Sequence, residues 1–250
     1  MRSRLLLLLP ALLLAPVPLI AQDDDDWEDE EEAWYEAPPA RSFFGLNLTL
    51  AQPTGEFAQQ VEGGIGGELS FLHRLDDAGW LALRIDGGLL LYGYERQHVP
   101  LSETVGHRIW VDLTTSNNIA FFGIGPQIGV PSGRFQPYVN AYAGYSYIYT
   151  QSSVSGSSYD YYDEPFATTT NFDDGTYSWG AGAGAYLPIT SGRVPISMDL
   201  GIKWRNNGVA EYLREGDIQD NDDGTLTLYP QRSDTDLMTF HIGVTLGLRR

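Results

Sequence analysis

The clearest pattern in the chain lies near its C-terminal end, where hydrophobic residues alternate with polar or small ones. The hydrophobic positions are Met238, Phe240, Ile242, Val244, Leu246 and Leu248. The positions between them are Thr239, His241, Gly243, Thr245 and Gly247. A period of two puts successive side chains on opposite faces of a strand. The pattern therefore predicts a β-strand with one apolar face and one polar or small face.

The same alternation recurs along the chain and predicts eight strands. Their expected ranges are 43–51, 65–74, 80–92, 118–130, 135–150, 176–187, 195–205 and 237–248. The fourth and fifth alternate less cleanly, because Phe121, Tyr138 and Tyr142 fall on the polar face.

The connections between these strands also alternate, in length. Turn-forming sequences lie at 76–79, 131–134 and 190–193. Long polar stretches, which we expect to be loops, lie at 52–64, 93–117, 151–175 and 206–236. Short turns on one side and long loops on the other are typical of outer-membrane barrels, with the short side periplasmic. We therefore predict an all-β, antiparallel, up-and-down transmembrane β-barrel of about eight strands over residues 43–250, with both termini in the periplasm.

The N-terminal residues have the features of an export signal. Arg2 and Arg4 form a charged head, an apolar run follows at 5–20, and Ala21 offers a small residue for cleavage. This predicts a signal peptide at 1–21. The alternative is an uncleaved membrane anchor, which the prolines in the run and its length, short of a full span, disfavour.

An acidic stretch separates this leader from the first strand. We expect 22–42 to be a disordered periplasmic tail, because the segment is strongly charged. The alternative is a partner-binding tail in which Trp27, Trp34 and Tyr35 act as anchors.

Composition excludes some partners and some sources of stability. The chain has no cysteine, so disulfides cannot hold an exported fold together. Its formal net charge is −18, which disfavours nucleic acid as a partner.

Charged residues on the polar faces of the strands indicate whether the apolar faces point into the barrel or out of it. They are Glu68, Arg74, Arg84, Asp86, Asp199, Lys203 and His241. A soluble lipocalin-like barrel would turn its apolar face inward around a ligand, but these charges do not suit such a cavity. We therefore expect the apolar faces to contact membrane lipid and the charges to face the interior.

The interior charges form the candidate site. We expect Glu68, Arg84, Asp86, Asp199, Lys203 and His241 to pair as a structural network that plugs the lumen, because buried charges need partners. The inward glycines Gly180, Gly182, Gly184 and Gly243 would leave room for these longer side chains. The alternative is an ion path or a proton relay.

The architecture, together with the last strand, resembles the small bacterial outer-membrane β-barrel proteins of the OmpX and OmpA-barrel type. The family's assembly signal is matched by His241, Gly243, Leu246 and Leu248, although Arg249 and Arg250 follow where the family usually ends on an aromatic residue. The resemblance implies residence in the outer membrane of a Gram-negative bacterium, with outer-membrane lipid and the barrel-assembly machinery as partners.

Sequence motifs for catalysis and metal binding are weak in this chain. Histidines occur at 73, 98, 107 and 241, without a nucleophile and an orienting group in a recognisable pattern. The acidic loop residues 215–223 do not fit an EF-hand around Gly224. We therefore expect no catalytic residues, no metal and no cofactor.

The long loops are the remaining candidates for function. Serines and tyrosines mix at 152–162, a composition that suits recognition of a surface ligand. The expected function is a structural or surface-interaction role through long extracellular loops. The alternatives are a narrow channel for small solutes and a lipid-modifying enzyme, such as a lipid A hydrolase or acyltransferase.

Overall fold

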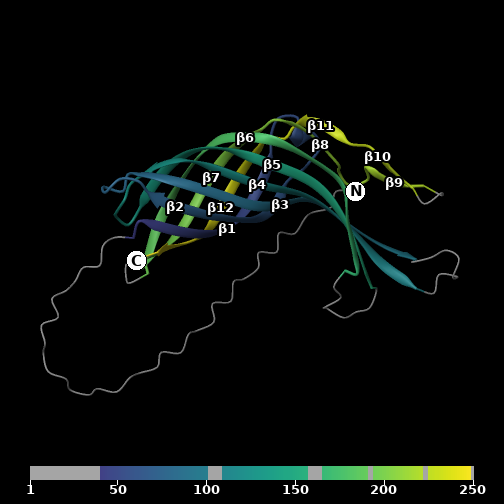
Figure 1. Ribbon diagram of the computed structural model, residues 1–250, viewed down its shortest axis with the longest axis horizontal. Helices are drawn as coiled ribbons and strands as arrows, with labels where there is room; N and C mark the ends of the chain where they lie inside the picture. Colours follow the sequence, from purple (N-terminus) through teal and green to yellow (C-terminus); the bar gives the residue numbers. More distant parts are fainter. Residues whose placement is uncertain (1–39, 101–108, 157–164, 191–193, 222–224, 249–250) are drawn as a thin grey trace, which may run out of the picture. The chain divides into compact units, whose positions relative to one another are not determined.

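The computed structural model describes residues 40–100, 109–156, 165–190, 194–221 and 225–248. Eight strands form a closed antiparallel ring in the order β1-β12-β7-β6-β5-β4-β3-β2 (Figure 1). Their bounds are β1 (Ser42–Pro53), β2 (Gly64–Arg74), β3 (Leu81–Pro100), β4 (Trp110–Gly129), β5 (Gln136–Gly156), β6 (Ala167–Thr190), β7 (Ile196–Asn207) and β12 (Leu237–Leu248). Pairing of β1 with β12 closes the ring and confirms the predicted eight-stranded up-and-down barrel. The expected signal peptide at 1–21 and nearly all of the expected tail at 22–42 lie outside the described residues, so that division of the chain stays a prediction.

Two of the stretches expected to be loops contain regular structure. The 3-10 helix η1 (Phe57–Gln59) lies in the first. In the last, β8 (Val209–Tyr212) pairs with β11 (Gln231–Asp234), and β9 (Ile218–Asp220) pairs with β10 (Leu226–Leu228). Each of these strands is only three or four residues long, too short for alternation to identify it from the sequence. No helix among the described residues is long and apolar enough to cross a bilayer.

The other two expected loops are largely strand, so those loop predictions were wrong. The β3–β4 ladder continues from Gly93 opposite Asn117 to Pro100 opposite Trp110, and the β5–β6 ladder continues past Gln151 opposite Thr170. In Figure 1 the β3–β4 pair runs on past the ring as a blue and teal ribbon. We call residues 93–100, 110–117, 151–156 and 167–171 the loop-side sheet. Both of its faces carry polar side chains, so it lacks the period-two hydropathy by which the sequence identified the other strands.

Register shifts mark where the loop-side sheet leaves the ring. One falls between Leu91 and Gly93 in the β3–β4 ladder, and the other between Thr150 and Gln151 in the β5–β6 ladder. A bulge adds a residue to one strand and bends it. The two bulges therefore let four strands continue while the rest of the ring ends.

The short turn at 76–79 forms as predicted. The backbone N–H groups of Leu81 and Trp80 donate to the Asp76 carboxylate at 2.8 and 3.2 Å. These bonds, that from Leu81 first, hold the pKa of the Asp76 carboxyl below its usual value. Gly79 closes the turn with a φ of 77°, in the left-handed region that favours glycine. Part of the expected turn at 190–193 lies outside the described residues.

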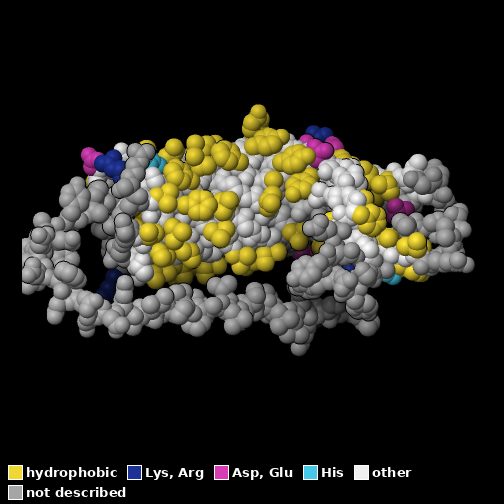
Figure 2. All heavy atoms as spheres, turned by 60° about the horizontal axis from the view of Figure 1, so that its bottom comes forward, with side chains coloured by type: hydrophobic (Ala, Val, Ile, Leu, Met, Phe, Trp, Pro, Cys, Tyr) yellow, Lys and Arg dark blue, Asp and Glu magenta, His cyan; other side chains and the backbone are white. Residues whose placement is uncertain are grey.

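The outer wall of the barrel is apolar and its interior is polar. Leu46 and Ile242 expose 62% and 51% of their surface, whereas Asn47 and His241, each next to one of them in the chain, are buried. Figure 2 shows hydrophobic side chains covering the visible wall, with the visible charged side chains toward its two ends. Aromatic residues lie near both ends of the wall, such as Trp80 at the short-turn end and the Trp179–Trp204 pair at the other. This is the arrangement of barrels that face lipid.

We expect Leu200→Arg to lower the free energy of unfolding from bilayers by roughly 2–4 kcal/mol, the cost of an outward Arg near the midplane. Leu200 lies in a cross-strand row with Ile242 and Leu48, at the middle of β7, β12 and β1. Ser197→Thr, on the inward face of the same strand, is the matched control and should change little. Equal stability of Leu200→Arg and the wild type in denaturant titrations would show that the outer face does not contact lipid.

Candidate functional site

The interior of the barrel holds a connected group of buried charges. Arg84 on β3 is its centre. Its Nε donates to the Asp86 Oδ1 at 2.7 Å, and its Nη2 lies 3.4 Å from the Glu68 Oε1. Its Nη1 lies 3.6 Å from the Asp199 Oδ2 on β7. One guanidinium thus contacts three carboxylates on three strands, which matches its five donors in a planar fork.

Lys203 supplies a second cation from the far side of the lumen. Its Nζ donates to the Glu68 Oε1 at 2.7 Å and to the Asp86 Oδ2 at 2.9 Å. β7 and β3 are four places apart in the ring of eight, so they face each other across the interior. The Lys203–Asp86 and Arg84–Asp199 pairs therefore join opposite walls of the barrel.

His241 joins the group through Asp199 and a tyrosine. Its Nε2 lies 3.2 Å from the Tyr138 hydroxyl and 3.6 Å from the Asp199 Oδ1, while Tyr138 donates to that oxygen at 2.8 Å. All six side chains predicted for the charge network thus lie in one cluster, whereas Arg74, the seventh charge expected inside, donates to the Pro131 carbonyl near a short turn.

The sequence analysis missed one interior cation, Arg205. It is 1% exposed, and its guanidinium carbon lies 4.1 Å from the centre of the Phe121 ring and 4.8 Å from that of Tyr142. Cation–π contact in a desolvated site is worth about 2 kcal/mol. The sequence pattern could have identified Arg205, because a period of two places it on the same face of β7 as Asp199 and Lys203. Its partners Phe121 and Tyr142 are two of the three aromatic residues that blurred the fourth and fifth strand patterns.

Glycines make the space that these side chains occupy. A Cβ on Gly182 would lie 2.8 Å from the Lys203 Cγ, and one on Gly201 would lie 2.4 Å from the His241 Cε1. An alanine at either place would push an interior side chain out of position.

Above the charges, toward the long-loop end, the interior becomes apolar. A row of three paired residues on adjacent strands begins this layer, and each is 1% exposed: Leu90 on β3, Ile119 on β4 and Ile148 on β5. Phe57 of η1 packs edge-to-face on Tyr212 of β8, with ring centres 5.0 Å apart. These residues belong to one buried cluster. The sequence analysis missed this layer because its members are apolar residues on the inward parity.

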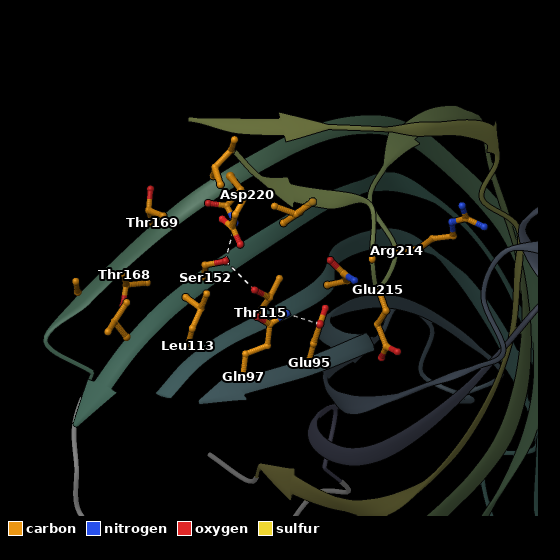
Figure 3. A pocket seen from close by; sticks show the side chains of 17 residues that line it. Glu95, Gln97, Leu113, Thr115, Ser152, Thr168, Thr169, Arg214, Glu215 and Asp220 are labelled. Atoms are coloured by element: carbon orange, nitrogen blue, oxygen red, sulfur yellow. Dashed lines mark hydrogen bonds between the residues drawn. The ribbon is translucent and has the colours of Figure 1, made fainter. Parts of the chain in front are cut away.

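A cavity of about 270 Å³ lies outside this layer, between the loop-side sheet and the β9–β10 hairpin (Figure 3). Its carboxylates are Glu95, Glu215 and Asp220. Its apolar lining includes Leu113, Val154, Ile218 and Leu226. The Asn171 Nδ2 donates to the Ser152 hydroxyl at 2.6 Å, and that hydroxyl shares a hydrogen bond with the Thr115 hydroxyl at 2.9 Å, which ties the cavity floor together.

A second cavity of about 490 Å³ adjoins the first, because Asn117, Arg214 and Glu215 line both. Arg214 is held by Asp217, whose two carboxylate oxygens each lie 3.1 Å from a guanidinium nitrogen. This bidentate contact raises the pKa of Arg214.

The residues that match the assembly signal lie on both faces of β12. His241 and Gly243 point inward, and a Cβ on Gly243 would meet the Asn47 Oδ1 at 2.1 Å. Leu246 and Leu248 are exposed on the outer wall. Arg249 and Arg250 lie outside the described residues.

The described part of the chain offers few groups for metal binding or catalysis. It contains no cluster of three or more His, Cys, Asp or Glu side chains that could hold a metal ion. His98 Nδ1 lies 2.9 Å from the Asp112 Oδ1 in the loop-side sheet, but Ser155 is opposite Asp112 on the next strand. The carboxylate thus lies between the serine and the histidine, whereas a catalytic triad needs the imidazole in the middle. His107 and the residues Asp222, Asp223 and Gly224 of the acidic loop lie outside the described residues.

We expect Lys203→Met to destabilise the barrel by about 3–5 kcal/mol, because Glu68 and Asp86 would then share Arg84 as their one remaining cation and a negative charge would stay buried without compensation. Lys203→Met combined with Glu68→Gln removes one charge of each sign and should recover part of the loss. Denaturant titrations of the refolded barrel measure both. An unchanged midpoint for the single variant would contradict the dependence of the barrel on this network.

No protein-family model matches the chain, and no curated protein matches it in sequence. Among solved structures, Neisserial surface protein A is similar over 82% of this chain and 96% of its own, with a TM-score of 0.41 and 10% identity. Ail, the attachment invasion locus protein of Yersinia pestis, is similar over 84% and 99%, with a TM-score of 0.40 and 8% identity. A major outer membrane protein of Thermus thermophilus is similar over 82% and 98%, with a TM-score of 0.39 and 11% identity. These three solved structures are small outer-membrane β-barrel proteins.

Proposed function

We propose that this protein is an outer-membrane β-barrel of a Gram-negative bacterium that acts by surface interaction through its loop end. The observation that carries the proposal is the loop-side sheet, which continues four barrel strands past the ring and lines a cavity there. An extension with polar faces is stable in water and costly in lipid, so it belongs outside the bilayer. Outer-membrane lipid along the wall and the barrel-assembly machinery at β12 are the partners that this location implies.

The proposal includes a lumen that is closed to solutes. Eight strands leave an interior just wide enough for side chains. In this barrel Arg84 and Lys203 bridge opposite walls, and the apolar layer around Ile119 lies between them and the loop end. A solute crossing the barrel would have to separate buried ion pairs and also pass a dry layer. The rival role, a narrow channel, requires both barriers to open.

Purified wild-type protein in planar bilayers should therefore show no large, long-lived open state. Ion pairs and apolar packing leave no continuous water column. A general porin inserted into the same membrane provides the positive control. Steady, high conductance that recurs across preparations would overturn the closed lumen and favour the channel.

Orientation can be tested cleanly because the chain has no cysteine of its own. We expect Ser153→Cys, in the loop-side sheet, to react with a membrane-impermeant maleimide on intact cells. Arg134→Cys, in a short turn, should react only after the outer membrane is permeabilised. The reverse result would place the short turns outside and contradict the proposed orientation.

We further propose that the protein is not an enzyme. His73 meets the Ser42 hydroxyl at 2.9 Å, but no carboxylate among the described residues hydrogen-bonds to its ring to orient it. The support is the arrangement of two other histidines: His241 is buried among Tyr138 and Asp199, and His98 is separated from Ser155 by Asp112. Neither arrangement presents an activated nucleophile to a lipid substrate. Mass spectrometry of lipid A from cells with and without the protein should give the same spectrum.

A further inference from the structure

We propose that the cavity of the loop-side sheet, with its neighbour, binds a basic polypeptide segment. A lysine or arginine side chain would enter the cavity of about 270 Å³, and its main chain would lie over the adjoining cavity of about 490 Å³. The inference rests on the proposed surface-interaction role and names the chemistry of the partner.

The carboxylates of the first cavity have no cation of their own. Glu95 accepts a hydrogen bond from the Gln97 Nε2 at 2.7 Å, and Glu215 accepts one from the backbone N–H of Tyr94 at 3.1 Å. Neither these two nor Asp220 forms a salt bridge with any side chain that the structure describes. The nearby Arg214 is already bound to Asp217. A ligand ammonium or guanidinium would therefore meet uncompensated negative charge.

Asn117 offers a hydrogen-bond donor to a ligand in either cavity. It is 2% exposed and lines both cavities, and its Oδ1 already accepts from the Thr150 hydroxyl at 2.7 Å. Its Nδ2 is left to donate into the cavities that the side chain lines. The bulge residue Gly93 leaves this amide free to reach a ligand, since a Cβ there would lie 2.6 Å from the Nδ2. A main-chain carbonyl is the acceptor that a peptide supplies and a simple amine lacks.

The remaining lining suits the aliphatic part of a basic side chain. Leu113, Val154 and Leu226 present apolar surface beside the carboxylates. Lysine and arginine bury their methylene stems along such surface while the charged head reaches polar partners. A short ion without a stem would leave this surface uncovered.

Charge over the whole loop end favours the same partner. The described loop-end residues include three arginines, Arg96, Arg214 and Arg232. They also include twelve carboxylates: Glu56, Glu62, Glu95, Asp112, Asp173, Asp174, Glu211, Glu215, Asp217, Asp220, Asp234 and Asp236. Such an excess attracts a basic partner over long range and repels acidic ones.

The test is calorimetric titration of the full chain in lipid nanodiscs with N-acetyl-trilysine amide at low salt. The wild type should bind it saturably at one site. Glu95→Gln with Asp220→Asn should weaken binding at least about tenfold, and each tenfold step corresponds to about 1.4 kcal/mol. Glu211→Gln with Asp234→Asn is the matched control, because it removes two loop-end charges outside both cavities and should change affinity by less than about twofold.

Two further probes separate a peptide from other cations. Trilysine with acetylated side chains should not bind, and spermidine, which has charge but no carbonyl, should bind more weakly than trilysine. Equal losses in the two double variants, or equal binding of spermidine, would overturn the inference in favour of diffuse charge attraction. A closed, correctly oriented barrel that fails to bind trilysine would sink this inference alone, whereas a conducting or inverted barrel would remove the proposed function beneath it.

Discussion

The contacts between opposite walls are the constraint on which the interior depends. Lys203 and Arg84 each reach a carboxylate four strands away around the ring, so the lumen cannot be wider than these side chains are long. Buried charges are tolerable only when they are paired, and the other interior features serve that requirement. Glycines on β6 and β7 give the cations room, and Tyr138 provides a neutral donor to Asp199.

The buried charges and the loop-end cavities are separated along the barrel axis. The charges occupy the interior of the ring, the apolar layer around Ile119 follows, and the cavities lie beyond it. A ligand in those cavities would therefore meet a surface whose base is the closed ring of strands. Rigid support lowers the entropic cost of binding, which is how scaffolds with functional loops generally work.

The sequence predicted the ring well because the ring has two unlike environments. Where lipid-facing and interior positions alternate, period two is plain, and the last strand has the predicted bounds, Leu237–Leu248. Past the bulge at Leu91 both faces carry polar side chains, so the contrast between the faces disappears and the sequence analysis took these strands for a loop. Inward charges were found by parity, yet the partners of Lys203 were not, because contacts across a lumen depend on closure of the ring. The cavities were beyond prediction, since they form between a sheet and a hairpin that alternation did not reveal.

The cross-wall pairs also have a consequence for the order in which the barrel is built. Glu68 and Asp86 lie on β2 and β3, and their shared cation lies on β7, so they meet only when β12 has closed against β1. In an open sheet Glu68 and Asp86 would keep only Arg84, while Lys203 would lose both of its carboxylates, and an unpaired ion away from water costs several kcal/mol. The free energy of an intermediate with seven strands in place is therefore raised, and the pairing of β12 with β1 lowers it. Closure of the ring therefore forms the cross-wall ion pairs, and reopening it would require breaking them.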